Sequence, residues 1–196
     1  MYFSATIFTI IGFKSPTLTS LVVAVTNFVF TLFALGLIDR IGRRRILLYS
    51  IPFMILGLLF SALGFSISGI GIGDDSEPSD GDSTSGAGII LVSIMVYVAS
   101  YALGLGNVPW MQSELFPLAV RSVGAGAATA ANWGSNFVIG LTFLPMMDAM
   151  GAPWTFVFYG IICLAGYVLI WRIYPETAGL SLEEATTLLD RGWGVR

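Results

Sequence analysis

Residues 17–45 read TLTSLVVAVTNFVFTLFALGLIDRIGRRR, a long apolar stretch that ends in one aspartate and four arginines. The apolar part can cross a bilayer as a helix, because a helix rises about 1.5 Å per residue and the hydrocarbon core is about 30 Å thick. Four further stretches, at 46–73, 83–113, 122–147 and 149–171, also lack Asp, Glu, Lys and Arg. Too little polar sequence remains to cover five such helices in water, so we expect an integral membrane protein.

Composition supports membrane insertion. Hydrophobic residues make up 56% of the 196 residues and charged residues only 11%, whereas an ordinary soluble domain has about 25% charged residues. The single cysteine, Cys163, lies in the last apolar stretch, so no intrachain disulfide can form. The chain has no histidine, which excludes metal sites of the usual histidine-containing kinds. We expect no metal, no cofactor and no nucleic-acid partner.

The basic residues indicate how the helices are oriented, because Lys and Arg in short loops favour the cytoplasmic side. They follow the first, third and fifth apolar stretches, at Arg40 to Arg45, at Arg121 and at Arg172. The second and fourth connecting loops contain only acidic charges. We therefore expect the first and third loops and the C-terminus in the cytoplasm, with Lys14 as an exception outside.

Three segments lie outside the five apolar spans. Residues 1–13 resemble part of an interrupted span without a removable signal peptide, so we expect that the front of a longer chain is missing. Residues 71–86 are rich in Gly, Ser and Asp and are predicted to form a flexible extracellular loop. Residues 175–196 are predicted to form a cytoplasmic tail with a short amphipathic helix. Residues 1–174 then form a transmembrane bundle with complete spans at about 17–38, 46–70, 87–110, 123–147 and 153–174.

Acidic and basic residues recur together on the expected cytoplasmic side. They are Asp39 and Arg43 in the first loop, Glu114 and Arg121 around the third, and Glu176 in the tail. Carboxylates and guanidinium groups can form bidentate bonds that hold helix ends together in one conformation and separate in another. We call these five residues the cytoplasmic latch. The alternative is a set of independent solvated charges.

A helix break is expected late in the third span, at Gly104, Gly106 and Pro109. Glycine permits unusual backbone angles, and proline lacks an N–H donor and clashes with the preceding turn. Within a bilayer, a broken helix is tolerated only where protein or a watery cavity surrounds it, as in transporter sites. These residues could therefore form a hinge. A proline kink that merely fits the neighbouring helices is the alternative.

Uncharged polar residues inside the spans are candidates for binding a solute. Asn132 and Asn136 are four residues apart and share a helical face, and Asn27 lies in the first complete span. Amides offer both donors and acceptors, as a polyhydroxylated solute requires, and the rings of Trp110 and Trp133 can stack on a sugar or cyclitol ring. Hydrogen bonding between helices is the alternative for each asparagine.

Small residues precede these asparagines in the fourth span. Residues 124–131 read GAGAATAA, and such residues let helix backbones approach closely. We expect this stretch to be a packing face.

Five sequence motifs follow one another along the chain. They are Tyr2-Phe3-Ser4, Asp39-Arg40-Ile41-Gly42-Arg43-Arg44, Pro109-Trp110 with Ser113-Glu114-Leu115-Phe116-Pro117 and Arg121, Asn132-Trp133, and Pro175-Glu176-Thr177 with Gly179 and Ser181-Leu182-Glu183-Glu184. With these motifs in this order, the chain resembles, over essentially its whole length, the second half of the sugar porter family within the major facilitator superfamily.

The resemblance implies an all-α membrane protein, namely the C-terminal six-helix bundle of a major facilitator superfamily transporter with its first helix incomplete. It implies a multi-pass protein of the plasma membrane whose partners are membrane lipid and the missing N-terminal bundle. By residue-wise carry-over, the substrate would contact Asn27, Trp110, Asn132 and Asn136, and Tyr2 and Trp133 would line the cavity. The cytoplasmic latch residues match charged positions of the family.

Within the family, residues 107–114 and 132–137 look most like fungal myo-inositol transporters, which couple uptake to protons. This resemblance implies proton-coupled myo-inositol uptake by alternating access, with this chain as a fragment that is inactive alone. Ala102 replaces a carboxylate of many hexose carriers, and the Trp-to-Glu spacing is one residue shorter, as in the inositol carriers. The proton-coupling carboxylate of the family lies on its first helix, outside this chain.

Other functions remain open at this point. The chain could belong to a transporter of a hexose or another polyol, or to a sensor or truncated subunit that moves no solute. Such sensors usually carry long cytoplasmic tails, whereas only about 20 residues follow the last span here. We do not expect an enzyme, because the sequence shows no nucleophile–base pair, metal cluster or phosphate loop.

Overall fold

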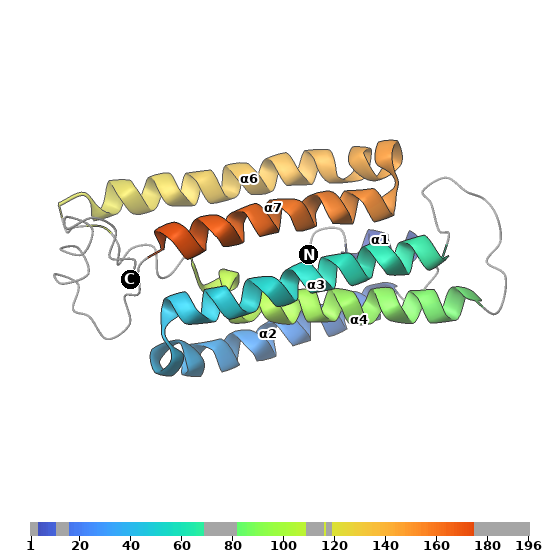
Figure 1. The fold of residues 1–196 in the computed structure, drawn as a ribbon, viewed down its shortest axis with the longest axis horizontal. Coiled ribbons are helices and arrows are strands. Elements are labelled where there is room, and N and C mark those ends of the chain that lie inside the picture. The colour runs from blue at the N-terminus through green and yellow to red at the C-terminus, as the bar shows by residue number, and fades with distance from the viewer. Residues whose placement is uncertain (1–3, 11–15, 69–81, 109–115, 117–118, 175–196) are drawn as a thin grey trace.

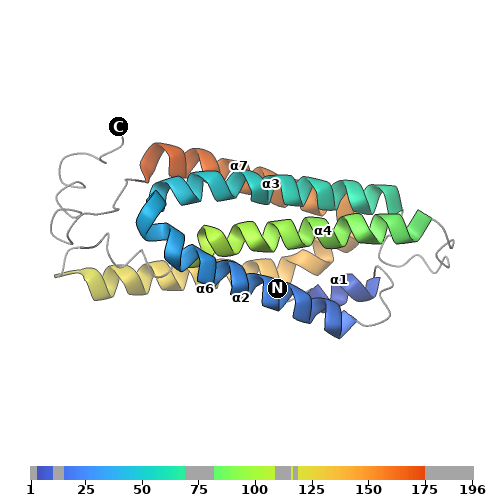
Figure 2. The same cartoon turned by 90° about the horizontal axis from the view of Figure 1, so that it is seen from below.

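Helices form the part of the chain that the computed structural model describes, which comprises residues 4–10, 16–68, 82–108, 116 and 119–174. No strand occurs among these residues. The long helices run side by side along the longest axis of the molecule (Figures 1 and 2). In chain order the elements are α1 (Ser4–Ile10), α2 (Pro16–Ile41), α3 (Arg43–Ser68), α4 (Asp82–Leu103), the 3-10 turn η1 (Leu105–Asn107), α6 (Arg121–Met150) and α7 (Ala152–Ile173).

Single glycines join two pairs of neighbouring helices. Gly42, between α2 and α3, has φ 97°, and Gly151, between α6 and α7, has φ 81°. Other residues rarely adopt these backbone angles, because a Cβ would clash with the backbone. The N–H of Gly42 donates to the carbonyl of Ile38 at 3.2 Å, and that of Gly151 to the carbonyl of Met147 at 3.0 Å. Each glycine thus caps one helix and lets the chain reverse at once into the next.

The closest packing joins α3 to α4. A Cβ on Gly57 would lie 3.1 Å from the carbonyl oxygen of Ser93 and from the backbone nitrogen of Tyr97. One turn further along α3, the buried Ser61 Oγ lies 2.8 Å from the Ser93 Oγ in a hydrogen bond. A Cβ on Gly64 would lie 2.7 Å from Ile90. Gly57, Ser61 and Gly64 therefore form a small-residue face against which α4 fits, as is common between helices in membranes.

Aromatic rings connect α3 to α6 and α7. The rings of Phe65 and Phe156 stack with centroids 5.3 Å apart, and Phe143 meets Phe156 edge-on at 6.2 Å. Phe8 of the short helix α1 is fully buried in the same apolar cluster. Both α1 and α6 are thus anchored to one core, although α1 has only seven residues.

Large apolar side chains cover the outside of the bundle. Phe28, Phe33 and Phe53 are each about three-fifths exposed, which would be costly in water but suits contact with lipid tails. By length and composition, three helical segments could cross a membrane: Thr17–Ile38, Arg43–Ile67 and Ala152–Ile173. Ala87–Leu103 is a shorter apolar helix, and α6 has 30 residues but is rich in Gly, Ala, Ser and Asn.

Both ends of α4 differ by several residues from the expected span at about 87–110. Helix α4 begins at Asp82, inside the segment predicted to be a loop, and the rest of that loop up to residue 81 lies outside the described residues. Helix α4 also ends at Leu103, seven residues before the predicted end of the span.

The close contact of α3 with α4 predicts opposite effects for two glycine substitutions. Gly57→Ala should lower the free energy of unfolding by about 1–3 kcal/mol, because the new Cβ meets backbone atoms of α4. Gly36→Ala, on α2, should raise it by about 0.5–1 kcal/mol, because no atom lies within 4 Å and alanine favours a helix. Thermal unfolding in detergent, followed by circular dichroism, measures both. Equal effects of the two substitutions would contradict the packing described here.

Candidate functional site

The helix break at the end of α4 is the most distinctive local feature of the bundle. The α-helix ends at Leu103, and Gly104 has φ −110° and ψ −87°, outside the helical region. The chain then makes one 3-10 turn, in which the N–H of Asn107 donates to the carbonyl of Gly104 at 3.2 Å. A Cβ on Gly104 would overlap the Ser50 hydroxyl of α3. Glycine is therefore required here by close approach of α3.

The side chain of Asn107 completes this break. Its Nδ2 donates to the carbonyls of Ala102, at 2.8 Å, and Leu103, at 3.4 Å. Those carbonyls lie at the end of α4, where the regular pattern of backbone bonds stops. The Asn107 side chain is only 2% exposed. An amide thus satisfies carbonyls that would otherwise be buried without donors, which would be costly.

Asn107 was not among the expected site residues. From the sequence, the break is expected at Gly104, Gly106 and Pro109, and asparagines within the spans are expected to be possible ligands of a solute. A signal was present, because an asparagine directly after a Gly-x-Gly break can donate back to freed carbonyls. Pro109 lies outside the described residues, so its share in the hinge remains a prediction.

Two of the expected binding residues lie together on α6. Asn132 is exposed, and the half-buried Asn136 donates from its Nδ2 to the backbone carbonyl of Asn132 at 3.0 Å. Trp133, beside them, is 60% exposed. The Ser135 hydroxyl donates to the carbonyl of Ala131 at 2.8 Å. This stretch of α6 therefore carries several polar groups and an indole that face away from the core of the described bundle.

The small residues that precede Asn132 do not pack as expected. Ala127, Thr129, Ala130 and Ala131 are exposed, and no atom lies within 4 Å of the position that a Cβ on Gly126 would take. The expectation of a packing face within this chain was wrong for these residues. Helix α6 contacts α7 as its main neighbour, so the small-residue face points out of the bundle. A Cβ on Gly124, nearer the start of the helix, would lie 2.6 Å from the ring of Phe116.

Asn27 occupies a different part of the bundle from the α6 amides. It is half-buried on α2, and its backbone carbonyl accepts a hydrogen bond from the Thr31 hydroxyl at 2.8 Å. Helix α2 packs mainly against α4 and α1, and Figure 2 shows α2 passing on the other side of α4 from α7. Within the described residues, α2 and α6 therefore share no extensive interface that would bring Asn27 and Asn132 together. Tyr2 and Trp110 lie outside the described residues.

The cytoplasmic latch is only partly described. Glu114, Glu176 and the side chain of Asp39 lie outside what the structure describes, so the expected ion pairs remain a prediction. Arg43 is half-buried, and the Nε of Arg121 donates to the carbonyl of Phe116 at 3.3 Å.

Arg44 makes a contact that the sequence reasoning missed. Its Nη2 donates to the carbonyl of Trp171 in the last turn of α7, at 2.9 Å. A cation at a helix C-terminus is favourable, because the last carbonyls carry partial negative charge. This bond connects the beginning of α3 to the end of α7. The orientation rule already accounts for all four arginines of the first loop, so nothing in the sequence distinguishes Arg44 from its neighbours.

The family is decided by a match that extends over nearly the whole chain. Residues 1–189 match the model of a family described as "Sugar (and other) transporter". The chain belongs to this sugar transporter family. It is therefore a multi-pass membrane protein, and the resemblance expected from its motifs is confirmed.

Several curated relatives that are similar to this chain are myo-inositol transporters of fungi. The chain is 45% identical to "Myo-inositol transporter 1" of Cryptococcus neoformans var. grubii over 100% of its own length and 35% of the relative. It is 44% identical to "Myo-inositol transporter 1" of Saccharomyces cerevisiae, over 100% of this chain and 34% of that one. A third relative, "Myo-inositol transporter 2" of Schizosaccharomyces pombe, is also 44% identical. The chain thus spans about a third of the length of these relatives.

Solved structures confirm the fold. The major facilitator superfamily proton:xylose symporter XylE, bound to 6-bromo-6-deoxy-D-glucose, superposes with a TM-score of 0.79 at 25% identity, over 95% of this chain and 38% of XylE. The inward-open form of XylE from E. coli gives a TM-score of 0.67 at 28% identity, over 94% of this chain and 39% of that one. The expected all-α fold, a transporter bundle with an incomplete first helix, is confirmed.

The two asparagine environments predict different costs of truncation. Asn107→Ala should lower the free energy of unfolding by about 1–3 kcal/mol, because two buried carbonyls lose their donor. Asn132→Ala is the matched control and should change it by less than about 0.5 kcal/mol, because its side chain is exposed. Thermal unfolding of the detergent-solubilised protein gives both values. If the two variants unfolded alike, the Asn107 amide would not hold the break.

Proposed function

We propose that this chain is part of a carrier that moves myo-inositol across the plasma membrane by alternating access, coupled to protons. The observation that carries this proposal is the 44–45% identity to myo-inositol transporters of three fungi along essentially the whole chain. Proton coupling is supported by the likeness to XylE, which is a proton:xylose symporter. The complete carrier would contain a further N-terminal bundle, and this chain alone would not transport.

The substrate is proposed to contact Asn27, Trp110, Asn132 and Asn136, with Tyr2 and Trp133 lining the cavity. On α6, the exposed Asn132 and Trp133 and the half-buried Asn136 support this assignment. Lipid tails would leave the Asn132 amide without partners, whereas the hydroxyls of a cyclitol can both donate to it and accept from it. The same face would then border the cavity between the two bundles.

The helix break after α4 supports a hinge near the proposed substrate site. Gly104 and Gly106 are proposed to act as the hinge with Pro109, and the Asn107 amide keeps the broken end satisfied. The cytoplasmic latch, Asp39, Arg43, Glu114, Arg121 and Glu176, is proposed to hold the helix ends in one of the two access states. With this arrangement, the C-terminus is proposed to lie in the cytoplasm.

The proposed site predicts a loss of uptake in cells that lack their own inositol carrier. A full-length parent with Asn132→Ala should take up labelled myo-inositol about tenfold less efficiently, because one lost hydrogen bond to substrate raises the barrier by about 1.4 kcal/mol. Thr142→Val is the control, because the Thr142 hydroxyl already bonds to the carbonyl of Val138 within α6. Initial rates over a range of inositol concentrations separate changes in KM from changes in kcat.

Three results would each contradict a part of the proposal. Unchanged uptake by both Asn132→Ala and Asn136→Ala would exclude the α6 amides from the site. Competition by xylose or glucose as strong as that by unlabelled myo-inositol would favour a hexose or general polyol carrier. Uptake by the 196-residue chain alone would show that no second bundle is needed.

A further inference from the structure

Four arginines crowd the turn between α2 and α3. Arg40 lies in the last turn of α2, and Arg43, Arg44 and Arg45 form the first turn of α3. A helix N-terminus already carries partial positive charge, so three cations there repel both one another and the helix dipole. The sequence of the turn supplies one acid, Asp39. The turn itself therefore has an excess of positive charge that a negative partner would stabilise.

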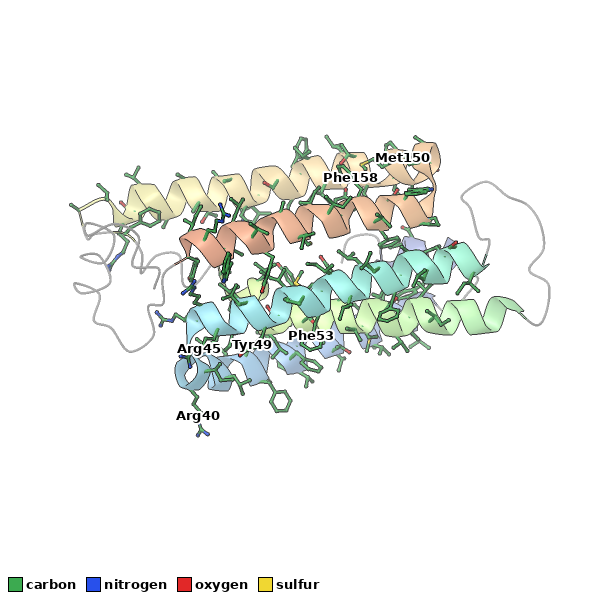
Figure 3. The ribbon with its side chains drawn as sticks, in the orientation of Figure 1. Arg40, Arg45, Tyr49, Phe53, Met150 and Phe158 are labelled. Carbon is green, nitrogen blue, oxygen red and sulfur yellow. The ribbon has the colours of Figure 1, made fainter. Side chains whose placement is uncertain are left out.

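The bundle itself supplies partners for only part of the cluster. Arg44 donates to the carbonyl of Trp171, and Arg43 is half-buried. Arg40 and Arg45 are both exposed, and neither has a hydrogen-bond or ion-pair partner within the described ranges. Figure 3 shows these two side chains at the end of the bundle where α2 turns into α3. Arg40 and Arg45 are thus available to an external anion.

An exposed aromatic stripe begins directly beside Arg45. Tyr49 and Phe53 follow it at four-residue intervals and so share its face of α3. They are 66% and 57% exposed, and Figure 3 shows Arg45, Tyr49 and Phe53 in succession along the helix. The same outer side continues with the exposed Leu56 and Phe60. From its cytoplasmic end inward, α3 therefore presents a cation, an amphipathic ring and then apolar side chains.

This order matches the layers of a phospholipid. Tyrosine prefers the membrane interface, where its ring and hydroxyl meet different environments. With a rise of about 1.5 Å per residue, Tyr49 lies about 6 Å and Phe53 about 12 Å deeper than Arg45. A headgroup phosphate beside Arg45 would thus place the start of an acyl chain along Tyr49 and Phe53. A free phosphate ion would use only the arginines and leave the stripe unoccupied.

We propose that this corner of the bundle binds one anionic phospholipid of the cytoplasmic leaflet. The guanidinium groups of Arg45 and Arg40 donate to its phosphate, and the Tyr49 hydroxyl donates at the ester level. An acyl chain packs against Phe53. A guanidinium group suits phosphate because its planar donors bind two oxygens at once. An anionic lipid is favoured over a zwitterionic one, since its headgroup keeps a net negative charge beside the arginines. The site is independent of the transported solute.

Lipid binding is measured on the whole chain in nanodiscs made of phosphatidylcholine with or without phosphatidylserine. Phosphatidylserine should raise the Tm, and native mass spectrometry should detect one retained phosphatidylserine. Arg45→Gln should weaken its retention about tenfold, as expected for loss of a charge-assisted pair. Arg40→Gln and Tyr49→Leu should weaken it less. Inorganic phosphate added to phosphatidylcholine nanodiscs should leave the Tm unchanged.

Arg121→Gln is the matched control, because it removes the same charge from the start of α6, where Arg121 donates to Phe116. If the Arg121→Gln variant retains phosphatidylserine as well as the unaltered chain does, the result supports the site. An equal loss with Arg121→Gln and Arg45→Gln would show only general attraction to a charged leaflet and would overturn the proposal. Arg45→Lys keeps the charge but loses the two-pronged donor, so undiminished retention with it would contradict the bidentate contact. If Arg45→Gln fails to fold in phosphatidylcholine alone, the Arg45→Lys result decides.

Discussion

Backbone polar groups inside a bilayer have no water to bind, and this constraint governs the whole bundle. Unbroken helices meet it with their own hydrogen bonds, so α2, α3 and α7 can be almost entirely apolar. Where α4 breaks at Leu103, the Asn107 amide donates to the two carbonyls at the helix end, and Gly104 lets α3 come close enough to exclude lipid. The break is therefore compatible with the membrane. It is also the one place among the described spans where the backbone departs from an α-helix inside the bundle.

The scarcity of polar side chains in the spans also determines how the helices hold together. Apolar side chains face lipid as readily as they face each other, so close backbone contact and a few hydrogen bonds must supply the specificity. Gly57 and Gly64 provide the contact between α3 and α4, and the Ser61–Ser93 bond lies between them. Arg44 adds a second type of link, from the start of α3 to the end of α7. Helix α6 has fewer such links, and its polar face is left open towards the side where the proposed second bundle would pack.

The sequence predicted features that depend on composition and spacing. Charge-free stretches predict the helices, and motifs such as Asp39 to Arg44 indicate the family. Both signals lie in short runs of neighbouring residues and can therefore be found in the sequence alone. Contacts between distant segments could not be predicted in this way. The same kinds of small residue occur on α3 and α6, yet Gly57 packs against α4 while Gly126 faces outward, and only the position of each helix decides between these outcomes. Asn107 was missed because an amide that binds a solute and an amide that caps a helix look identical in sequence.

The proposed carrier requires that α6 present its amides to a watery, solute-binding cavity and not to lipid. This requirement is tested by labelling with a membrane-impermeant, water-soluble thiol reagent, in a membrane-embedded full-length parent whose Cys163 is replaced by alanine. We predict that the Asn132→Cys and Asn136→Cys variants react and that myo-inositol slows both reactions, whereas Phe33→Cys, on the exposed apolar face of α2, stays unreactive. Equal inertness of the α6 variants and Phe33→Cys, with or without myo-inositol, would contradict it.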